Sequence, residues 1–412
     1  MRSIKTVALV AATLLLVPQL AAAADLDTEV QEMKNRLEQM ETQLKAQDQE
    51  LAAAKEDRTA TSALSSFLEK TDISGFVAGG WNWSKEDGAA EGTNTFAIQQ
   101  YWIEMNKAPT EESRAGFNIA LQGGEFCTQG GCAAGVQGLP VSANSNTVHL
   151  YTANVSYMAP IGSGLTITAG IMPTLIGYEV ENQNGNFFIT RSLLWDNQPV
   201  TSTGVTAGYN ITDQLSLTVG AINSPITEDR FDDISAKAIT SLLAFSAEKF
   251  YLSAGLNWGK LTGSGQGGAI CNPAILNPVG AACDSQGIFD LIATVNPIDK
   301  LMIGVNYDYH FSKWQNDTDG VTANGISVFG TFDIIDSTSV GVRYDWLGAD
   351  LGDGFGGGRV LEQWEITATV AHKITDGLTG KVEYRHDKVD TDLVATGQRN
   401  QNSVFVQMMY EF

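Results

Sequence analysis

Few residues of this chain are arranged for catalysis. A hydrolytic site needs a nucleophile beside a base, or a cluster of carboxylates and histidines. No Gly-X-Ser-X-Gly element occurs in the sequence, and the four histidines are far apart. On the strands that the residue pattern predicts, only His310 faces inward; the histidines expected to face outward are His149, His372 and His386. The sequence therefore predicts a protein that is not an enzyme and has no cofactor.

The four cysteines form two pairs that are close in sequence. Cys127 is near Cys132, and Cys271 is near Cys283. An even number of cysteines in an exported chain favours disulfides. No histidine and no Cys-X-X-Cys lies near either pair, which disfavours a metal site. We therefore predict a Cys127–Cys132 and a Cys271–Cys283 disulfide, each within a single long outer loop.

A further set of charged residues could influence the passage of ions through a channel. The long connector 173–199 carries Glu179, Glu181, Arg191 and Asp196. If this connector folds into a channel and narrows it, its mixed charges would set a transverse field across the constriction. The alternative is that these side chains only pair with one another at the surface. The sequence leaves both interpretations open.

The elements that position these residues are strands with two different faces. In 213–223, Leu215, Leu217 and Val219 alternate with Ser216 and Thr218, and the same period of two runs from residue 71 to the end. The apolar faces that can be assigned carry no charge, while the opposite faces are mostly Gly, Ser, Thr and Asn. An Arg or Lys on a lipid-facing strand position costs roughly 2–4 kcal/mol at mid-membrane. The pattern therefore favours apolar faces that contact lipid.

The number and spacing of the strands indicate a closed barrel. Short connectors alternate strictly with long ones, and most of the predicted strands have ten to thirteen residues, as membrane-crossing strands require. We predict an all-β fold, a transmembrane antiparallel barrel over 72–412. The sixteen predicted strands are 72–84, 95–107, 112–124, 146–159, 164–173, 200–211, 213–223, 236–247, 249–259, 286–297, 299–311, 321–333, 337–347, 361–374, 376–388 and 402–412.

Alternation also places charges on the barrel wall. Carboxylates outnumber arginines both there and in the 173–199 connector, and a negative field in a pore concentrates cations, so we expect a weak cation preference. Neighbours such as Arg343 and Asp345, two apart on one face, would instead neutralise each other locally. The residues predicted to face the lumen are Glu104, Arg114, Asp308, Arg343, Asp345, Glu365, Glu383 and Arg385.

The N-terminal residues differ from the rest. A basic start, the apolar run VALVAATLLLV and an Ala-Ala-Ala end at residue 24 are typical of a signal peptide, 1–24. Residues 25–58 follow a heptad pattern, which predicts a periplasmic coiled-coil helix and a homotrimer; a lone charged helix is the alternative. Residues 59–71 form the predicted linker. The apolar heptad positions are Leu26, Val30, Met33, Leu37, Met40, Leu44 and Leu51.

The net charge and the last residue of the chain indicate which partners the protein can have. The formal net charge of −22 becomes −24 once Arg2 and Lys5 leave with the signal peptide, which argues against binding nucleic acid. The chain ends in Phe412, and a terminal aromatic on the last strand is what the barrel-assembly machinery reads. The predicted location is the outer membrane, in contact with its lipid.

Two regions are similar to a known family. In 165–224 a strand runs into Gly177-Tyr178-Glu179, followed by a polar insert, an Arg-Ser-Leu-Leu segment and a Thr-Gly-Val strand start. The second region holds VGVRYDWLGADLGDG and KVEYRHDKVD. These features resemble the OmpL-like putative beta-barrel porin family, which implies an outer-membrane porin.

Sixteen strands enclose a water-filled lumen, whereas eight are filled by their own side chains. The expected function is passive diffusion of small hydrophilic solutes or ions. The alternative is a structural anchor that contacts peptidoglycan through its N-terminal helix.

Overall fold

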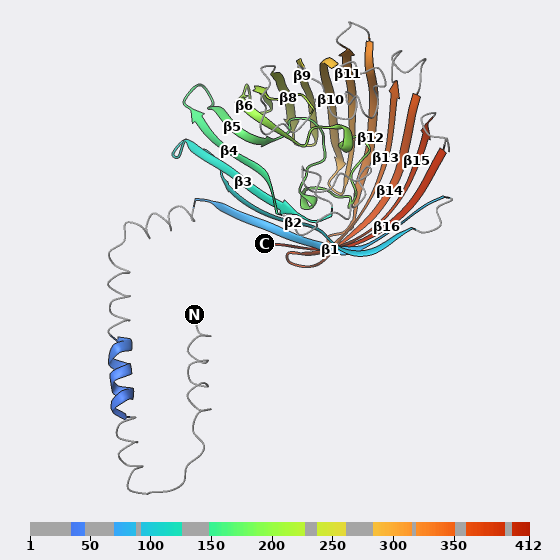
Figure 1. The fold of residues 1–412 in the computed structure, drawn as a ribbon. Coiled ribbons are helices and arrows are strands. Elements are labelled where there is room, and N and C mark those ends of the chain that lie inside the picture. The colour runs from blue at the N-terminus through green and yellow to red at the C-terminus, as the bar shows by residue number, and fades with distance from the viewer. Residues whose placement is uncertain are drawn as a thin grey trace. The chain divides into compact units, whose positions relative to one another are not determined.

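The computed structural model contains two compact units, Met1–Lys70 and Thr71–Phe412 (Figure 1). In the first unit, residues 34–45 form a helix. Leu37, Met40 and Leu44 are exposed and spaced by three and four residues, so they share one face of that helix. None of the described helices is long and apolar enough to cross a membrane. The structure describes residues 34–45, 70–87, 92–125, 148–226, 237–260, 283–314, 319–350, 360–391 and 398–412.

Several sequence predictions lie outside these residues. They include the signal peptide, nearly all of the linker, most of the predicted coiled coil, and Cys127, Cys132 and Cys271. Cys283 was expected in a connector, but the backbone places it as the first residue of a strand. The reason is that inter-strand pairing continues beyond the stretch that the apolar alternation marks, here up to the pairing of Cys283 with Trp314.

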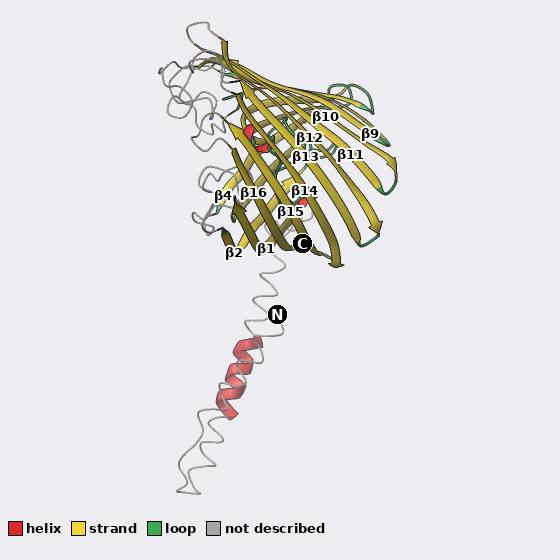
Figure 2. Ribbon diagram, turned by 90° about the vertical axis from the view of Figure 1, so that its right-hand side faces the viewer, coloured by secondary structure: helices red, strands yellow, loops and turns green. Residues whose placement is uncertain are grey.

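Over the described part of the second unit the chain forms a closed antiparallel barrel of sixteen strands, and this prediction is confirmed (Figure 2). Each strand pairs with its sequence neighbours, and β1 closes the ring with β16. The strands are β1 (Asp72–Glu86), β2 (Thr93–Lys107), β3 (Ala115–Gly123), β4 (His149–Ala159), β5 (Leu165–Pro173), β6 (Thr201–Asn210), β7 (Leu215–Ile222), β8 (Ala238–Ala247), β9 (Phe250–Lys260), β10 (Cys283–Ile298), β11 (Leu301–Trp314), β12 (Asp319–Ile335), β13 (Thr338–Asp350), β14 (Val360–Thr375), β15 (Leu378–Thr391) and β16 (Gln398–Glu411).

The ring is joined by the two ends of the barrel domain. The N–H of Phe412 donates to the carbonyl of Gly75 at 3.0 Å, and the N–H of Gly75 donates back to Phe412 at 3.1 Å. Farther along the same pair, Trp81 lies opposite Val406. The closure leaves no free edge strand, so backbone groups at the seam are satisfied within the barrel, as a lipid environment demands.

The two faces of the wall have opposite character, as β15 shows. Val382 and Tyr384 are 53% and 46% exposed on the outside, whereas Glu383 between them is fully buried on the inside. The same alternation holds along β13, where Val342 and Tyr344 flank the buried Arg343. Apolar side chains thus face outward in these stretches, and the buried charged side chains of Glu383 and Arg343 face the lumen.

Bulges interrupt this alternation on the β3–β4 pair. The register shifts at Ala120/Leu121, and Tyr151 and Thr152 are consequently both buried on the lumen side. Beyond the shift, His149 lies opposite Gln122, whose side chain is in the lumen, and directly opposite residues share a face. The expectation that His149 faces outward is therefore wrong, because strict alternation fails at a bulge.

Candidate pore constriction

The connector between β5 and β6, residues 174–200, folds inside the barrel and is called the inner loop here (Figure 1). Its turn at Gly177 has a φ of 92°, a left-handed conformation that glycine adopts without strain. Two short 3₁₀ helices follow, η1 (Gln183–Gly185) and η2 (Trp195–Asn197). The loop is thus a compact element with its own turns.

One asparagine folds the first half of the inner loop on itself. The Asn186 carboxamide accepts from the Val180 N–H at 3.0 Å. Its Nδ2 donates to the carbonyls of Val180 and Asn182 at 2.7 and 3.0 Å. A single side chain therefore replaces three backbone partners that a strand or helix would have supplied.

Apolar side chains of the inner loop pack where the wall has glycines. A Cβ built on Gly255 would lie 2.8 Å from Cδ1 of Ile176, and one on Gly325 would lie 3.0 Å from Cγ of Leu194. Both distances are shorter than ordinary carbon contacts, so the Ile176 and Leu194 side chains would have to shift to admit a larger residue at these wall positions. Ile176 and Leu194 are almost fully buried.

A wall carboxylate holds the middle of the inner loop. Glu383 on β15 accepts from the backbone N–H groups of Ile189 and Thr190 at 2.6 and 2.8 Å. It also accepts from the Thr190 hydroxyl at 2.6 Å, and Thr369 on β14 donates to it from the wall. Because hydrogen bonds to an ionised acceptor are stronger than neutral ones, Glu383 is a major attachment point.

Arg343 on β13 joins the wall to the same part of the loop. Its Nη1 donates to Oε1 of Glu179 at 3.0 Å and to the carbonyl of Thr190 at 2.8 Å. Its Nε lies 2.8 Å from Oε1 of Glu365 and 3.2 Å from Oδ2 of Asp345. Arg343 thus bridges two wall carboxylates and one loop carboxylate.

The next residues of the loop are held in the same way. Nη1 of Arg385 donates to the carbonyl of Arg191 at 2.5 Å, and its Nε lies 3.3 Å from Oε2 of Glu365. The N–H of Leu193 donates to Oδ2 of Asp345 at 3.1 Å. Wall charges of β13 and β15 therefore bind backbone groups of the loop from residue 189 to residue 193.

The remaining attachments reach β11 and the opposite wall. Gln198 donates to Oδ2 of Asp308 at 2.7 Å. Across the lumen, Gln122 on β3 donates to Oε1 of Glu181 at 2.9 Å, and the N–H of Gln183 donates to Gln100 on β2 at 2.8 Å. The loop therefore bridges strands on widely separated parts of the ring.

Arg191 is turned away from open water. Its guanidinium lies 5.3 Å from the ring centroid of Trp195, and Nη2 donates to the carbonyl of Glu181 at 2.7 Å. Burial lowers the pKa of Arg191, while the carboxylates of Glu179 and Glu181 act in the opposite direction. Its charge is thus held inside the loop.

The structure brings most of the predicted lumen residues together, but in a packed interface. In the inner loop, Glu181 and Arg191 are buried, Glu179 is half-buried and Asp196 is exposed. Glu104 lies apart, on the β2 wall. The wall residues buried among their partners are Asp308, Arg343, Asp345, Glu365, Glu383 and Arg385.

One predicted wall residue lies just before the strand to which it was assigned. Arg114 was assigned to a strand beginning at residue 112, but β3 begins at Ala115. Its Nη1 donates to the carbonyl of Met158 at the end of β4, 3.2 Å away. Two glutamates, a serine and Arg114 precede the strand here, so the connector is longer than the predicted connector APTE.

A group of neutral amides also joins the inner loop to the wall and was missed by reasoning from charges. Gln407 on β16 donates to Gln183 of the loop at 2.8 Å and to Gln99 on β2 at 2.9 Å. Gln100 donates to Gln122 at 2.8 Å. The adjacent Gln99 and Gln100 are the sequence signal that could have revealed this network, because two consecutive polar residues break the alternation.

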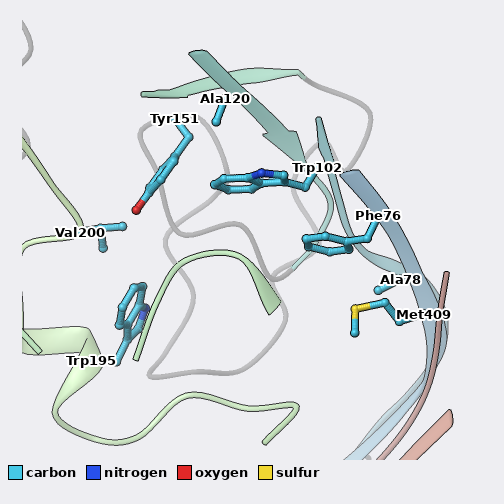
Figure 3. Close-up of a cluster of buried hydrophobic side chains, with 8 residues drawn as sticks. All are labelled: Phe76, Ala78, Trp102, Ala120, Tyr151, Trp195, Val200 and Met409. Atoms are coloured by element: carbon cyan, nitrogen blue, oxygen red, sulfur yellow. The ribbon is translucent and has the colours of Figure 1, made fainter. Parts of the chain in front are cut away.

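A cavity lies between the inner loop and the shorter strands. Its volume is about 420 Å³, and it is lined by Thr174, Leu175, Val180 and Asn182 of the loop and by wall residues of β2 to β6 and of β8. Trp102 lines this cavity, and Figure 3 shows it between Phe76 and Tyr151, with Trp195 and Val200 of the loop across from them. The Trp102 and Tyr151 ring centroids are 4.8 Å apart.

A closed sixteen-stranded barrel with a connector folded into its lumen is the architecture of an outer-membrane channel. The family model "Putative beta-barrel porin-2, OmpL-like" matches residues 70–412. The chain belongs to this family, and the resemblance seen in the sequence is confirmed. No curated protein sequence matches the chain.

Solved structures share the fold at low sequence identity. The outer membrane channel DcaP of Acinetobacter baumannii is 12% identical, with a TM-score of 0.55, and the match covers 83% of this chain and 97% of that one. The anion-selective porin from Comamonas acidovorans is 12% identical, with a TM-score of 0.57 and coverage of 83% and 99%. The trimer form of Vibrio cholerae OmpT is 12% identical, with a TM-score of 0.53 and coverage of 83% and 99%. At this identity the likeness concerns the fold.

Proposed function

We propose that this protein is a porin through which small hydrophilic solutes and ions diffuse passively, with a weak preference for cations. The observation that carries the proposal is the cavity of about 420 Å³ beside the inner loop, lined largely by Thr, Ser and Asn side chains. A lumen wall of neutral polar groups accepts hydrated solutes without a strong binding site. Passive diffusion through such a channel requires no catalytic step from the protein.

Single-channel recording in a planar bilayer tests this function. The purified, folded protein should insert and give stepwise, ohmic increases in current. Folding is checked beforehand by the heat-dependent mobility of the barrel in gel electrophoresis. A correctly folded sample that inserts into vesicles and passes neither salt nor small sugars would contradict the proposal.

The cation preference should weaken as salt rises, because the Debye length falls from about 10 Å at 0.1 M to about 3 Å at 1 M. A protein of similar fold is named as an anion-selective porin, so the fold does not set the sign of the preference. The sign must come from individual side chains. Reversal potentials in a potassium chloride gradient measure it directly.

We also propose that the protein assembles as a homotrimer. The described helix exposes Leu37, Met40 and Leu44 on one face, and a heptad seam of this kind buries its apolar residues against copies of itself. A porin of the same fold is recorded in a trimer form. In this assignment the helix is periplasmic, and pull-down with purified peptidoglycan tests whether it also anchors the barrel to the cell wall.

A further inference from the structure

We propose that Glu104 is the residue that determines the ion selectivity of the channel, and that most other charges predicted for the lumen do not contribute to it. This inference rests on the proposed porin function. Among the described residues that line the cavity, Glu104 is the one with a charged side chain. Its neighbours there are neutral, such as Asn118, Asn154, Thr168 and Thr206. Among the described lining residues, a solute in this cavity therefore meets a single formal charge.

The buried charges of the barrel wall are engaged elsewhere. Glu365 and Arg343 are essentially inaccessible to solvent, and their closest atoms are 2.8 Å apart. Glu383 is likewise buried and is bound by backbone groups of the inner loop. At short range an arginine and a carboxylate cancel each other's field, so a passing ion experiences little of either. The numerous carboxylates of β13 to β15 are therefore a poor guide to selectivity.

Glu104 differs because its hydrogen-bond partners are neutral. Its Oε2 accepts from Nε1 of Trp102 at 3.1 Å, and its Oε1 accepts from Nδ2 of Asn118 at 2.5 Å. The Asn118 carbonyl oxygen in turn accepts from the hydroxyl of Thr152. These contacts fix the orientation of the carboxylate without neutralising it. Each carboxylate oxygen keeps a second lone pair that can face the passage.

This arrangement favours a defined class of solutes. A fixed, half-buried carboxylate attracts hydrated monovalent cations and small molecules that carry an ammonium group. It disfavours anions, and multivalent anions most strongly. The adjacent Asn and Thr groups can hydrogen-bond to the polar remainder of a solute, so neutral hydrophilic molecules are admitted as well.

The expected size of the effect follows from Coulomb's law. A unit charge about 7 Å from an ion in water changes the local concentration of that ion roughly three-fold, upward for a cation and downward for an anion. Removing the charge should therefore lower the potassium-to-chloride permeability ratio by about seven-fold in dilute salt. At 1 M salt the wild type and the variant should have nearly the same permeability ratio.

Reversal potentials of four variants in a potassium chloride gradient test the inference. Glu104→Gln keeps the size of the side chain and should lose the cation preference, whereas Glu104→Asp should retain it. Thr168→Lys adds a positive charge to the β5 wall of the same cavity and should also abolish the preference, while leaving the Glu104 contacts intact. The control is Asp376→Asn, which removes an exposed carboxylate in the β14–β15 turn, outside the cavity, and should have no effect.

The outcomes separate the two proposals. If the wild type forms no channel, the porin function is overturned and this inference with it. If the channels conduct but Glu104→Gln and Thr168→Lys both keep the wild-type reversal potential, the inference alone is overturned. An equal shift in Asp376→Asn would also overturn it, because selectivity would then follow the total charge of the barrel.

Discussion

Replacing Glu383 by Gln should weaken the attachment of the inner loop to the barrel wall while leaving the barrel folded. The substitution preserves the size of the side chain but replaces one carboxylate oxygen by an NH₂ group. In the wild type, Glu383 accepts from the N–H groups of Ile189 and Thr190 at 2.6 and 2.8 Å. In the variant, one of these buried donors must face another donor.

The magnitude follows from the contacts that change. A hydrogen bond to a charged acceptor contributes about 1.5–3 kcal/mol, and an unsatisfied buried donor costs about 1–3 kcal/mol. Loss of one such bond, together with an unsatisfied N–H, therefore destabilises the docked loop by roughly 3 kcal/mol. Since 1.4 kcal/mol is a factor of ten, the population of the detached loop should rise about a hundred-fold.

Two measurements follow this population. Hydrogen exchange with mass-spectrometric detection should show about a hundred-fold loss of protection in a peptide that covers residues 187–195. Single-channel recordings should show added current noise and excursions to a larger conductance, because the loop no longer narrows the lumen continuously. The melting temperature of the barrel should change little, since the inter-strand hydrogen bonds of β15 remain.

The matched control removes a different partner of the same carboxylate. Thr369 donates its hydroxyl to Oε2 of Glu383 at 2.7 Å from the neighbouring strand. Thr369→Val therefore deletes a contact within the wall and leaves every contact with the loop in place, so exchange in 187–195 should stay close to that of the wild type. Wild-type exchange and noise in Glu383→Gln would refute the view that this carboxylate holds the loop.

Two further predictions concern parts of the chain beyond the barrel wall. Deletion of residues 25–58 should shift the protein from trimer to monomer in mild detergent, and a wild-type protein that is monomeric with its helix intact would contradict the trimer. Disulfides Cys127–Cys132 and Cys271–Cys283 should each contribute about 2–3 kcal/mol by closing short loops. Reduction of the disulfides should leave the barrel folded. Non-reducing peptide mapping that finds Cys127 or Cys132 bonded to Cys271 or Cys283 would contradict the assignment.

The barrel could be predicted from the sequence because each strand carries its own signal. A lipid-facing position excludes charge, so the alternation of Val382, Glu383 and Tyr384 reveals both the strand and its orientation. The residues at which the strands begin and end were harder to predict from the sequence. The predicted strand 286–297 corresponds to β10, which begins at Cys283, because backbone pairing continues past the membrane where alternation is no longer required.

The candidate site could be predicted only in part. Alternation predicts that Arg343 and Glu383 face the lumen, and both side chains are buried against the inner loop. Their partners could not be predicted, because the path of the inner loop depends on Gly177, on the Asn186 side chain and on wall glycines such as Gly325. None of these has a spacing that the sequence alone would associate with a loop folded inward. The sequence therefore left open whether an inward-facing charge meets the pore or is neutralised by a neighbouring side chain.

Charged side chains in the lumen have two roles, and their burial distinguishes them. Buried charges bind the inner loop, whereas a charge that borders the cavity acts on solutes. A loop that crosses the lumen buries backbone groups outside any strand or helix, and these need partners. Glu383 and Arg343 supply such partners, one accepting from the backbone and one donating to it. Glu104 has neutral partners and borders the passage, so its charge acts on solutes. Loop variants should therefore alter conductance and noise, whereas variants of Glu104 should alter the reversal potential, and the two effects can be measured independently in one recording.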